Sequence, residues 1–400
     1  MSLYTIEEPA QHVQHPVWSG KHALWALGFR PFYLLAALLA VVAVPLWLAR
    51  YLGYMDAAPA ITLGWHMHEM VFGFGVAVVV GFLLTAVRAW TGVWTPRGAQ
   101  LAGRALVWVA ARVAMLTAPA WLAAGIDLLF LPLAAFALYR VLKQAGNKRN
   151  MFLVALLALL TVANAAFHGA ALGLLSISQV TPIHAAILVI VLIEAVIGGR
   201  VIPMFTDSAV PGTKSLVLPR NDQIAMAVLV AAGAGWVFDA PGPLMAGLAF
   251  LAACATGLRL VGWKPQRALK VPLLWILHLS YAWIPIGFVL LALAALGVGT
   301  ASTAFHALVV GSMGGLIIGM MTRTSLGHTG RKLAAGKAEV AMYVLIQAGA
   351  VARVAAGMAP PQWRDAALVV SGLCWSLSFA LFLLAYSPYL WRPRVDGKEG

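Results

Sequence analysis

Long apolar runs, separated by short polar segments, follow one another along almost the whole chain. A helix needs about 20 mainly apolar residues to cross the hydrocarbon core of a membrane. Runs of that kind predict twelve membrane-spanning helices at 31–49, 67–87, 100–117, 120–139, 151–175, 181–202, 223–239, 243–261, 272–297, 302–322, 338–358 and 366–387. The pattern predicts an all-α, polytopic membrane protein with a cytoplasmic N-terminal segment at 1–30, a single twelve-helix domain at 31–387 and a cytoplasmic C-terminal tail at 388–400.

The orientation is predicted from the basic residues. Cytoplasmic loops of membrane proteins carry an excess of Lys and Arg. Of the 27 Lys and Arg residues, all but Arg50, Arg112, Arg353 and Arg364 fall in every second polar segment, beginning with the N-terminal one. We therefore expect both termini on the cytoplasmic side.

The composition excludes a soluble protein. The chain is 62% hydrophobic and only 10% charged, whereas soluble domains carry about 25% charged residues. The net charge of +14 would favour nucleic acid in a soluble protein, but here it is typical of basic loops beside anionic lipid. Cys254 and Cys374 lie in apolar spans and predict neither a disulfide framework nor a Cys-x-x-Cys metal site. We expect a lipid bilayer and no nucleic acid as partners.

Five histidines are predicted to share one depth near the outer face. His66 and His68 open the second span, His168 lies near the outer end of the fifth, and His184 and His306 open the sixth and tenth. Neutral imidazole is the commonest protein metal ligand, so this gathering favours metal or haem ligation over histidines that are only solvated at an interface. His66 and His68 are two positions apart, about 200° around a helix, and could serve two different centres.

A candidate second site is predicted on the inner side. His278 lies two turns into the ninth span and His328 follows the tenth. The stretch between Arg323 and Arg331 is basic and punctuated by glycine, so it either binds a phosphate or haem carboxylate or forms a solvated turn. The two inner histidines form a site or anchor loops.

Several charged residues fall within the apolar spans, where they need partners. Arg112 and Asp127 flank a tight turn and are expected to pair across it or to clamp an anionic group such as a haem propionate. Glu69 shares a helix face with His66. Glu194 is expected either to relay protons or to pair with Arg200.

The second and tenth spans carry an internal repeat. Five residues of one match five of the other at an offset of 238 positions: His68, Gly73, Gly81, Thr91 and Gly92 match His306, Gly311, Gly319, Thr329 and Gly330. With His184 opening the sixth span, this spacing predicts three four-helix units around a pseudo-threefold axis, unless the matches are chance. The layout resembles the twelve-helix subunit of the haem–copper oxidases, but the sixth span lacks that family's His-His pair and the tenth carries one histidine where that family has two.

Glycines in the tenth span repeat every four residues, at Gly311, Gly315 and Gly319. Such a stripe allows a close approach to the backbone. It indicates close helix packing or, as the alternative, room for a flat porphyrin.

Seven motifs together resemble the NnrS family: Gly28–Phe32, Trp65–Met70, Phe72–Phe74, Gly81–Ala86, Arg200–Thr206, Gly319–Arg323 and Gly327–Arg331. The resemblance covers nearly the whole chain. It implies a bacterial inner-membrane protein that contains haem and copper and is associated with nitric oxide metabolism, denitrification or resistance to nitrosative stress. It does not transfer individual ligands.

The function predicted on these grounds is haem and copper binding, with nitric oxide bound or detoxified. Whether the chain is an NO-metabolising oxidoreductase is left open, and such an enzyme would need an electron donor such as a membrane quinol. We expect His68 and His306 to hold one haem, and His66 with His184 or His168 to hold a second haem or the copper. The alternatives are a secondary transporter coupled to protons or a metal, and a non-catalytic accessory subunit in respiration.

Overall fold

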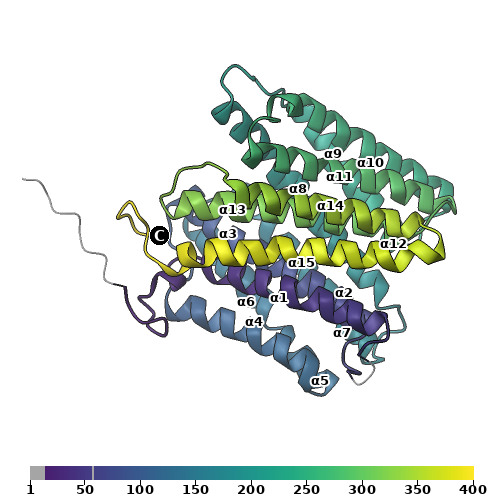
Figure 1. The fold of residues 1–400 in the computed structure, drawn as a ribbon, viewed down its shortest axis with the longest axis horizontal. Helices are drawn as coiled ribbons and strands as arrows, with labels where there is room; N and C mark the ends of the chain where they lie inside the picture. The colour runs from purple at the N-terminus through teal and green to yellow at the C-terminus, as the bar shows by residue number, and fades with distance from the viewer. Residues whose placement is uncertain (1–13, 56–57) are drawn as a thin grey trace, which may run out of the picture.

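A computed structural model describes residues 14–55 and 58–400, so residues 1–13 of the predicted N-terminal segment lie outside the described residues. The described residues contain no strand, and their helices form one bundle with a common long direction (Figure 1). The helical segments that correspond to the predicted spans are α1 (Phe29–Tyr51), α2 (Leu63–His68) with η2 (Glu69–Gly75) and α3 (Val76–Thr91), α4 (Ala99–Thr117), α5 (Ala120–Asp127) with α6 (Phe130–Gln144), α7 (Phe152–Ala171), α8 (Val180–Ala209), α9 (Pro219–Val237), α10 (Gly242–Gly262), α11 (Pro272–Ala295), α12 (Ala301–His306) with η5 (Ala307–Gly314) and α13 (Gly315–His328), α14 (Lys337–Met358) and α15 (Pro361–Trp391). The predicted all-α membrane fold is confirmed, and the protein is a multi-pass membrane protein.

Eleven of these segments are long and apolar enough to cross a membrane by composition alone, and α9 is the exception. Its first turn is polar because it contains Arg220 and Asp222. The positions of the first and last long helices nevertheless indicate that α9 also crosses the membrane. Arg30 at the start of α1 donates a hydrogen bond to the carbonyl of Leu390 at the end of α15, so both ends lie at one end of the bundle and the number of crossings is even.

The second and tenth spans have the same local structure, which confirms the internal repeat. Thr62 and Thr300 cap α2 and α12, and each side chain accepts a hydrogen bond from the backbone N–H three residues later. A π-helical segment begins directly after His68 in one span and directly after His306 in the other. These paired features all keep the offset of 238 residues.

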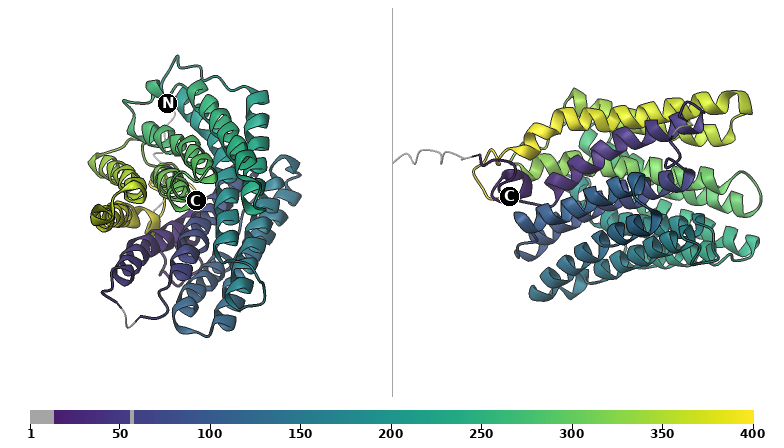
Figure 2. Two further views of the ribbon diagram at one scale, coloured as in Figure 1. Left: turned by 90° about the vertical axis from the view of Figure 1, so that its right-hand side faces the viewer. Right: turned by 90° about the horizontal axis from the view of Figure 1, so that it is seen from below.

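The sixth span, α8, is one continuous α-helix and lacks the π-helical segment of the other two. It still meets them at the centre of the bundle, because residues of α3, α8, η5 and α13 line one shared cavity. The left view of Figure 2 looks along the helices from the histidine end and shows them side by side in the bundle. The pseudo-threefold arrangement of three complete units stays a prediction.

The glycine stripe of the tenth span packs against α11. A Cβ on Gly311 would lie 2.3 Å from the ring of Trp283, and one on Gly319 would lie 2.9 Å from Leu277. A Cβ on Gly315 would collide with Ser280. The close-packing interpretation of this stripe is therefore confirmed, and a helix occupies the space that a porphyrin would need.

The C-terminal segment folds over the end of the bundle that carries Arg30, which we call the tail end. The buried Arg30 guanidinium donates hydrogen bonds to the carbonyls of Arg392 at 2.8 Å and Gly400 at 2.7 Å. Arg394 forms an ion pair with Asp396, and this pair holds the pKa of the Asp396 carboxyl well below its usual range. The opposite end, where α2, α8 and α12 begin, is the histidine end (Figure 1).

Candidate metal centre

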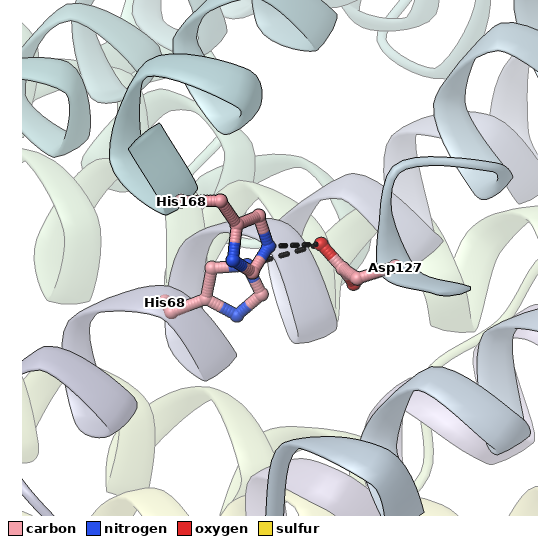
Figure 3. Close-up of side chains that lie close together, drawn as sticks. All are labelled: His68, Asp127 and His168. Carbon is pink, nitrogen blue, oxygen red and sulfur yellow. Dashed lines mark hydrogen bonds and ion pairs between the residues drawn. The ribbon is translucent and has the colours of Figure 1, made fainter. Parts of the chain in front are cut away.

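Three buried side chains from three helices meet at the histidine end: His68, Asp127 and His168 (Figure 3). The Nε2 atom of His68 lies 3.1 Å from Asp127 Oδ2, and the Nε2 atom of His168 lies 3.0 Å from the same oxygen. One donor atom from each residue falls within 4.8 Å of the other two. We call these three residues the His–Asp group.

Polar side chains surround and orient the His–Asp group. Asn164, one turn before His168 in α7, donates a hydrogen bond from Nδ2 to Asp127 Oδ2 at 2.7 Å, and its Oδ1 lies 3.0 Å from His68 Nε2. Arg112 of α4 donates to Glu69 Oε2 at 3.2 Å and also to Asp127 Oδ1. The predicted Arg112–Asp127 pair across the hairpin is therefore confirmed.

The local backbone explains why these side chains meet. The predicted span 120–139 is interrupted, because α5 ends at Asp127 and α6 begins at Phe130. His68 is the last residue of α2, before the helix widens into η2. Within η2, Gly73 leaves room for the guanidinium, since a Cβ there would lie 2.7 Å from Arg112 Nη1.

The charges of this network leave one positive charge to be supplied. Glu69 and Asp127 are carboxylates, whereas Arg112 is one guanidinium. Both ring nitrogens of His68 face oxygens, with Nδ1 at 3.2 Å from Glu69 Oε1. Burying unbalanced charge is costly, so either a proton on His68 or a metal cation completes the balance.

The donor set suits a metal ion that accepts nitrogen and oxygen ligands. Two imidazoles and a carboxylate are ligands of zinc, copper and non-haem iron in proteins. Ligating histidines commonly donate their other ring N–H to a carboxylate that fixes the ring. Glu69 accepts such a bond from His68 Nδ1, and Arg112 in turn holds Glu69.

A second histidine group, His66 with His306 and Arg353, lies at the same end. His306 donates from Nδ1 to the carbonyl of Ser302 at 2.7 Å, so its Nε2 is the lone-pair nitrogen. Arg353 Nη2 lies over the edge of this ring, 3.2 Å from Nε2 and 3.0 Å from Nδ1. His66 interacts electrostatically with both His306 and Arg353, and its buried Nδ1 has no hydrogen-bond partner among the described residues.

His184 lines a cavity of about 580 Å³ between α8, α9 and α10, which we call the outer cavity. Trp236 donates its indole N–H to His184 Nδ1 at 3.0 Å, and Phe305 stacks on the imidazole at 3.7 Å. Because Nδ1 accepts a bond, Nε2 carries the hydrogen of the neutral ring.

His68 and His306 have different neighbours in the structure. His68 contacts Asp127, Asn164 and Glu69, whereas His306 contacts Arg353 and Ser302. These contacts do not test whether the two histidines hold one haem, so the expected His68–His306 pair stays a prediction. Each histidine faces the helices that follow its own span, because the repeat places the two in equivalent but separate surroundings. The ligand roles of all five outer histidines stay predictions.

The two inner histidines are likewise apart. His278 of α11 forms a hydrogen bond through Nε2 with Thr206 at 2.9 Å. The ring of His328 packs on Phe29 of α1, with ring centroids 5.7 Å apart. Arg323 lies over the ring of Phe205. No second metal cluster is found in the part of the chain that the structure describes.

The expected Glu194–Arg200 pair is replaced by other contacts. Arg200 donates to Asn150 Oδ1 at 2.7 Å, while Glu194 accepts a hydrogen bond from Ser312 at 2.6 Å. The two side chains differ because Glu194 faces the bundle centre and Arg200 faces the loop before α7. A role for Glu194 in proton relay stays a prediction.

Asn164, whose side-chain amide contacts His68 and Asp127, was not predicted as a site residue from the sequence. The signal was present, because Asn164 and His168 are four residues apart and share one face of an apolar helix. Arg353 was also missed as a site residue. Its signal is its place in the outer half of a span, where a lone guanidinium needs a partner.

A family model described as NnrS protein matches residues 23–394 of the chain. No curated protein matches the chain. The matched stretch includes every residue of the His–Asp group and of the second histidine group. The chain therefore belongs to the NnrS family.

Proposed function

We propose that this protein is a metal-containing membrane protein that binds nitric oxide. Family membership supports a nitric oxide-related membrane protein. The observation that carries the proposal is the buried His–Asp group, in which two imidazoles and a carboxylate converge. The surrounding network pairs two carboxylates with one guanidinium, so a bound cation would balance its charge.

Copper is the metal that we propose for the His–Asp group. Imidazole nitrogen and carboxylate oxygen suit Cu(II), and the family resemblance favours copper among the metals that accept these ligands. His68, His168 and Asp127 would hold the ion. Asn164 would supply an oxygen as a fourth ligand or would position Asp127, to which it donates a hydrogen bond at 2.7 Å.

Haem is the cofactor that we propose for the second histidine group. His306 would hold the haem iron through Nε2, since its Nδ1 is fixed by the Ser302 carbonyl. The buried Nδ1 of His66 lacks a partner and would gain one as a ligand. Arg353 provides a cation for a haem carboxylate.

The chain's own residues would act chiefly by positioning. Glu69 keeps the hydrogen of His68 on Nδ1 and turns Nε2 toward Asp127, while Arg112 fixes both carboxylates. The metal would supply a coordination position for the nitrogen atom of nitric oxide. Because nitric oxide is small, neutral and lipid-soluble, it reaches a buried site through the membrane. If it is reduced, an external donor such as a membrane quinol must supply the electrons.

The test is metal analysis of the purified protein together with its spectra. We expect copper with an electron paramagnetic resonance signal of nitrogen ligation, and a haem absorption band that shifts on addition of nitric oxide. His168→Ala should remove the copper signal, and His306→Ala should change the haem band. His278→Ala removes a buried histidine that bonds Thr206 and should change neither.

Two outcomes would contradict the proposal. A preparation that stays colourless and metal-free after haem and copper are supplied would favour a transporter. A metal-containing protein that does not bind nitric oxide, combined with loss of another enzyme's cofactor on deletion, would favour an accessory role.

A further inference from the structure

We propose that a cavity at the centre of the bundle binds a small, neutral, apolar molecule that enters from the membrane. The identification of that molecule as nitric oxide rests on the proposed function. The cavity lies where the second, sixth and tenth spans meet, about half-way along them. It is distinct from the outer cavity beside His184. Its wall draws on six segments, through Tyr33 of α1, Phe82 of α3, Ile193 of α8, Leu277 of α11, Met313 of η5 and Ile317 of α13.

The wall of this central cavity is almost wholly apolar. Its lining consists of Val, Ile, Leu, Phe, Met and Gly residues, and the exceptions are Tyr33 and Glu194. Glu194 accepts a hydrogen bond from Ser312 at 2.6 Å, so this carboxyl has a partner. Cavities with apolar walls hold no ordered water and bind apolar molecules.

Tyr33 is the one hydroxyl-bearing residue among the lining residues. It is fully buried, and its hydroxyl approaches Thr324, which is not one of the lining residues. The tyrosine ring therefore adds to the apolar wall of the cavity.

The size of the cavity selects among ligands. Its volume is about 90 Å³, and one water molecule needs roughly 10–15 Å³ on this measure. A diatomic molecule fits easily, whereas a haem or a quinone ring does not. The wall includes half-buried side chains such as Val79 and Phe82, so the cavity is not sealed from its surroundings.

The cavity lies directly below both histidine groups. Met313 of its wall follows His306 by seven residues, and Gly75, which contacts Met313, follows His68 by seven residues. Seven residues make about two helical turns. A molecule in the cavity is therefore about two helical turns from either group, and the two π-helical segments lie between the cavity and the histidines.

The first experiment uses xenon, a neutral apolar atom, as the probe. The full-length protein is crystallised, pressurised with xenon and examined by anomalous diffraction. We expect xenon between Ile193 and Met313. Ile193→Trp should abolish this site, and Ile317→Phe provides a smaller substitution if the first variant does not fold. Val162→Trp, at a position of α7 that is 65% exposed, should leave xenon binding intact.

Xenon absent from this cavity while bound elsewhere would overturn the inference. So would a chain of ordered waters, or a cation held between Glu194 and Met313. In metal-loaded protein, Ile193→Trp should slow nitric oxide association by roughly tenfold, or about 1.4 kcal/mol in the barrier, without changing metal content. If the protein holds no metal, the proposed function fails, and the xenon result still decides whether the cavity binds apolar molecules.

Discussion

Gly75 and Met313 occupy equivalent positions of the internal repeat, and they are in contact. Their numbers differ by 238, the same offset that relates His68 to His306. A Cβ on Gly75 would lie 3.0 Å from Met313 Sδ. Residues related by a repeat can touch only close to the axis that relates them. The two π-helical segments therefore cross near the centre of the bundle.

This crossing explains how two matching histidines come to have different neighbours. Each lies seven residues from the contact, and each contacts helices that follow its own span. His68 approaches Asp127 of α5, which is held by Arg112 of α4, and His306 approaches Arg353 of α14. The repeat thus places the two histidines among different side chains.

Gly73→Ala should disturb the His–Asp group from within η2. The new methyl group would lie 2.7 Å from Arg112 Nη1 and 3.0 Å from Glu69 Oε2. Overpacking of this kind costs about 1–3 kcal/mol. We expect a lower melting temperature and weaker metal binding, measured by unfolding in detergent and by metal titration. Gly103→Ala in α4 is the matched control, since a Cβ there meets nothing within 4 Å; equal losses in both variants would refute the prediction.

Arg112→Ala should be the most destabilising single change in this network. It leaves the buried carboxylates of Glu69 and Asp127 without their cation. Breaking a buried pair by removing one partner costs about 3–5 kcal/mol. The measurement is tryptophan fluorescence during heating at a fixed scan rate. Arg104→Ala on the same helix, where the side chain donates a hydrogen bond to the Gln100 carbonyl rather than to a carboxylate, should change stability by no more than about 0.5 kcal/mol.

The sequence was sufficient for the membrane fold because each span is a local property of composition. The predicted spans all correspond to helices, and the internal repeat was visible as five matching residues. The differences between the predicted and the observed helix boundaries have local causes. The span that includes Asp127 breaks at Leu128–Leu129, and the last helix runs on to Trp391 rather than 387. Neither change alters hydrophobicity enough to be seen in a 20-residue window.

The candidate site could be predicted only in part. Topology gives the depth of a residue, so the gathering of histidines at one end followed from the sequence. It does not give the direction in which a side chain points, which depends on helix rotation and on the π-helical segments. The Arg112–Asp127 pair was predictable because a tight turn joins the two helices. Asn164, His68 and Asp127 lie on three separate helices, and only packing brings them together.

Cysteine labelling should establish the orientation. In a background without Cys254 and Cys374, Ser176→Cys lies in the exposed loop before α8 and Ala334→Cys in the exposed loop before α14. The basic loops predict that only the first reacts with a membrane-impermeant maleimide added outside intact cells. Permeabilised cells provide the control, in which both should react. Reaction of Ala334→Cys alone in intact cells would mean that the topology is inverted.

Arg30→Gln should release the C-terminal segment. The buried guanidinium donates hydrogen bonds to the carbonyls of Leu390, Arg392 and Gly400, and glutamine has too few donors to replace them. We expect faster trypsin cleavage after Arg394. Arg97→Gln is the control, because Arg97 contacts the same segment through an exposed ion pair with Glu399 at 3.7 Å, and such pairs contribute little. Unchanged cleavage in Arg30→Gln would show that other contacts hold the segment.

Deletion of Met70 should test whether the π-helical segment η2 aims His68. In a π-helix each backbone bond spans one more residue than in an α-helix, and the N–H of Val76 bonds to the carbonyl of Val71 in this way. Removing one residue would restore α-helical spacing and turn His68 by about 100° relative to Gly75. His68 would then leave Asp127. The loss of copper should therefore exceed the roughly 10- to 100-fold in affinity typical of a change beyond the direct ligands.

Deletion of Ser176, in an exposed loop, shortens the chain equally and should leave copper in place. The yield of each variant in the membrane fraction shows whether it is inserted. The absorption band of the proposed haem reports whether the second histidine group is intact. Copper retained by the Met70 deletion would mean that the widened helix does not orient His68. A haem band that persists while copper is lost would show that the two groups are independent, as expected if each histidine belongs to its own repeat.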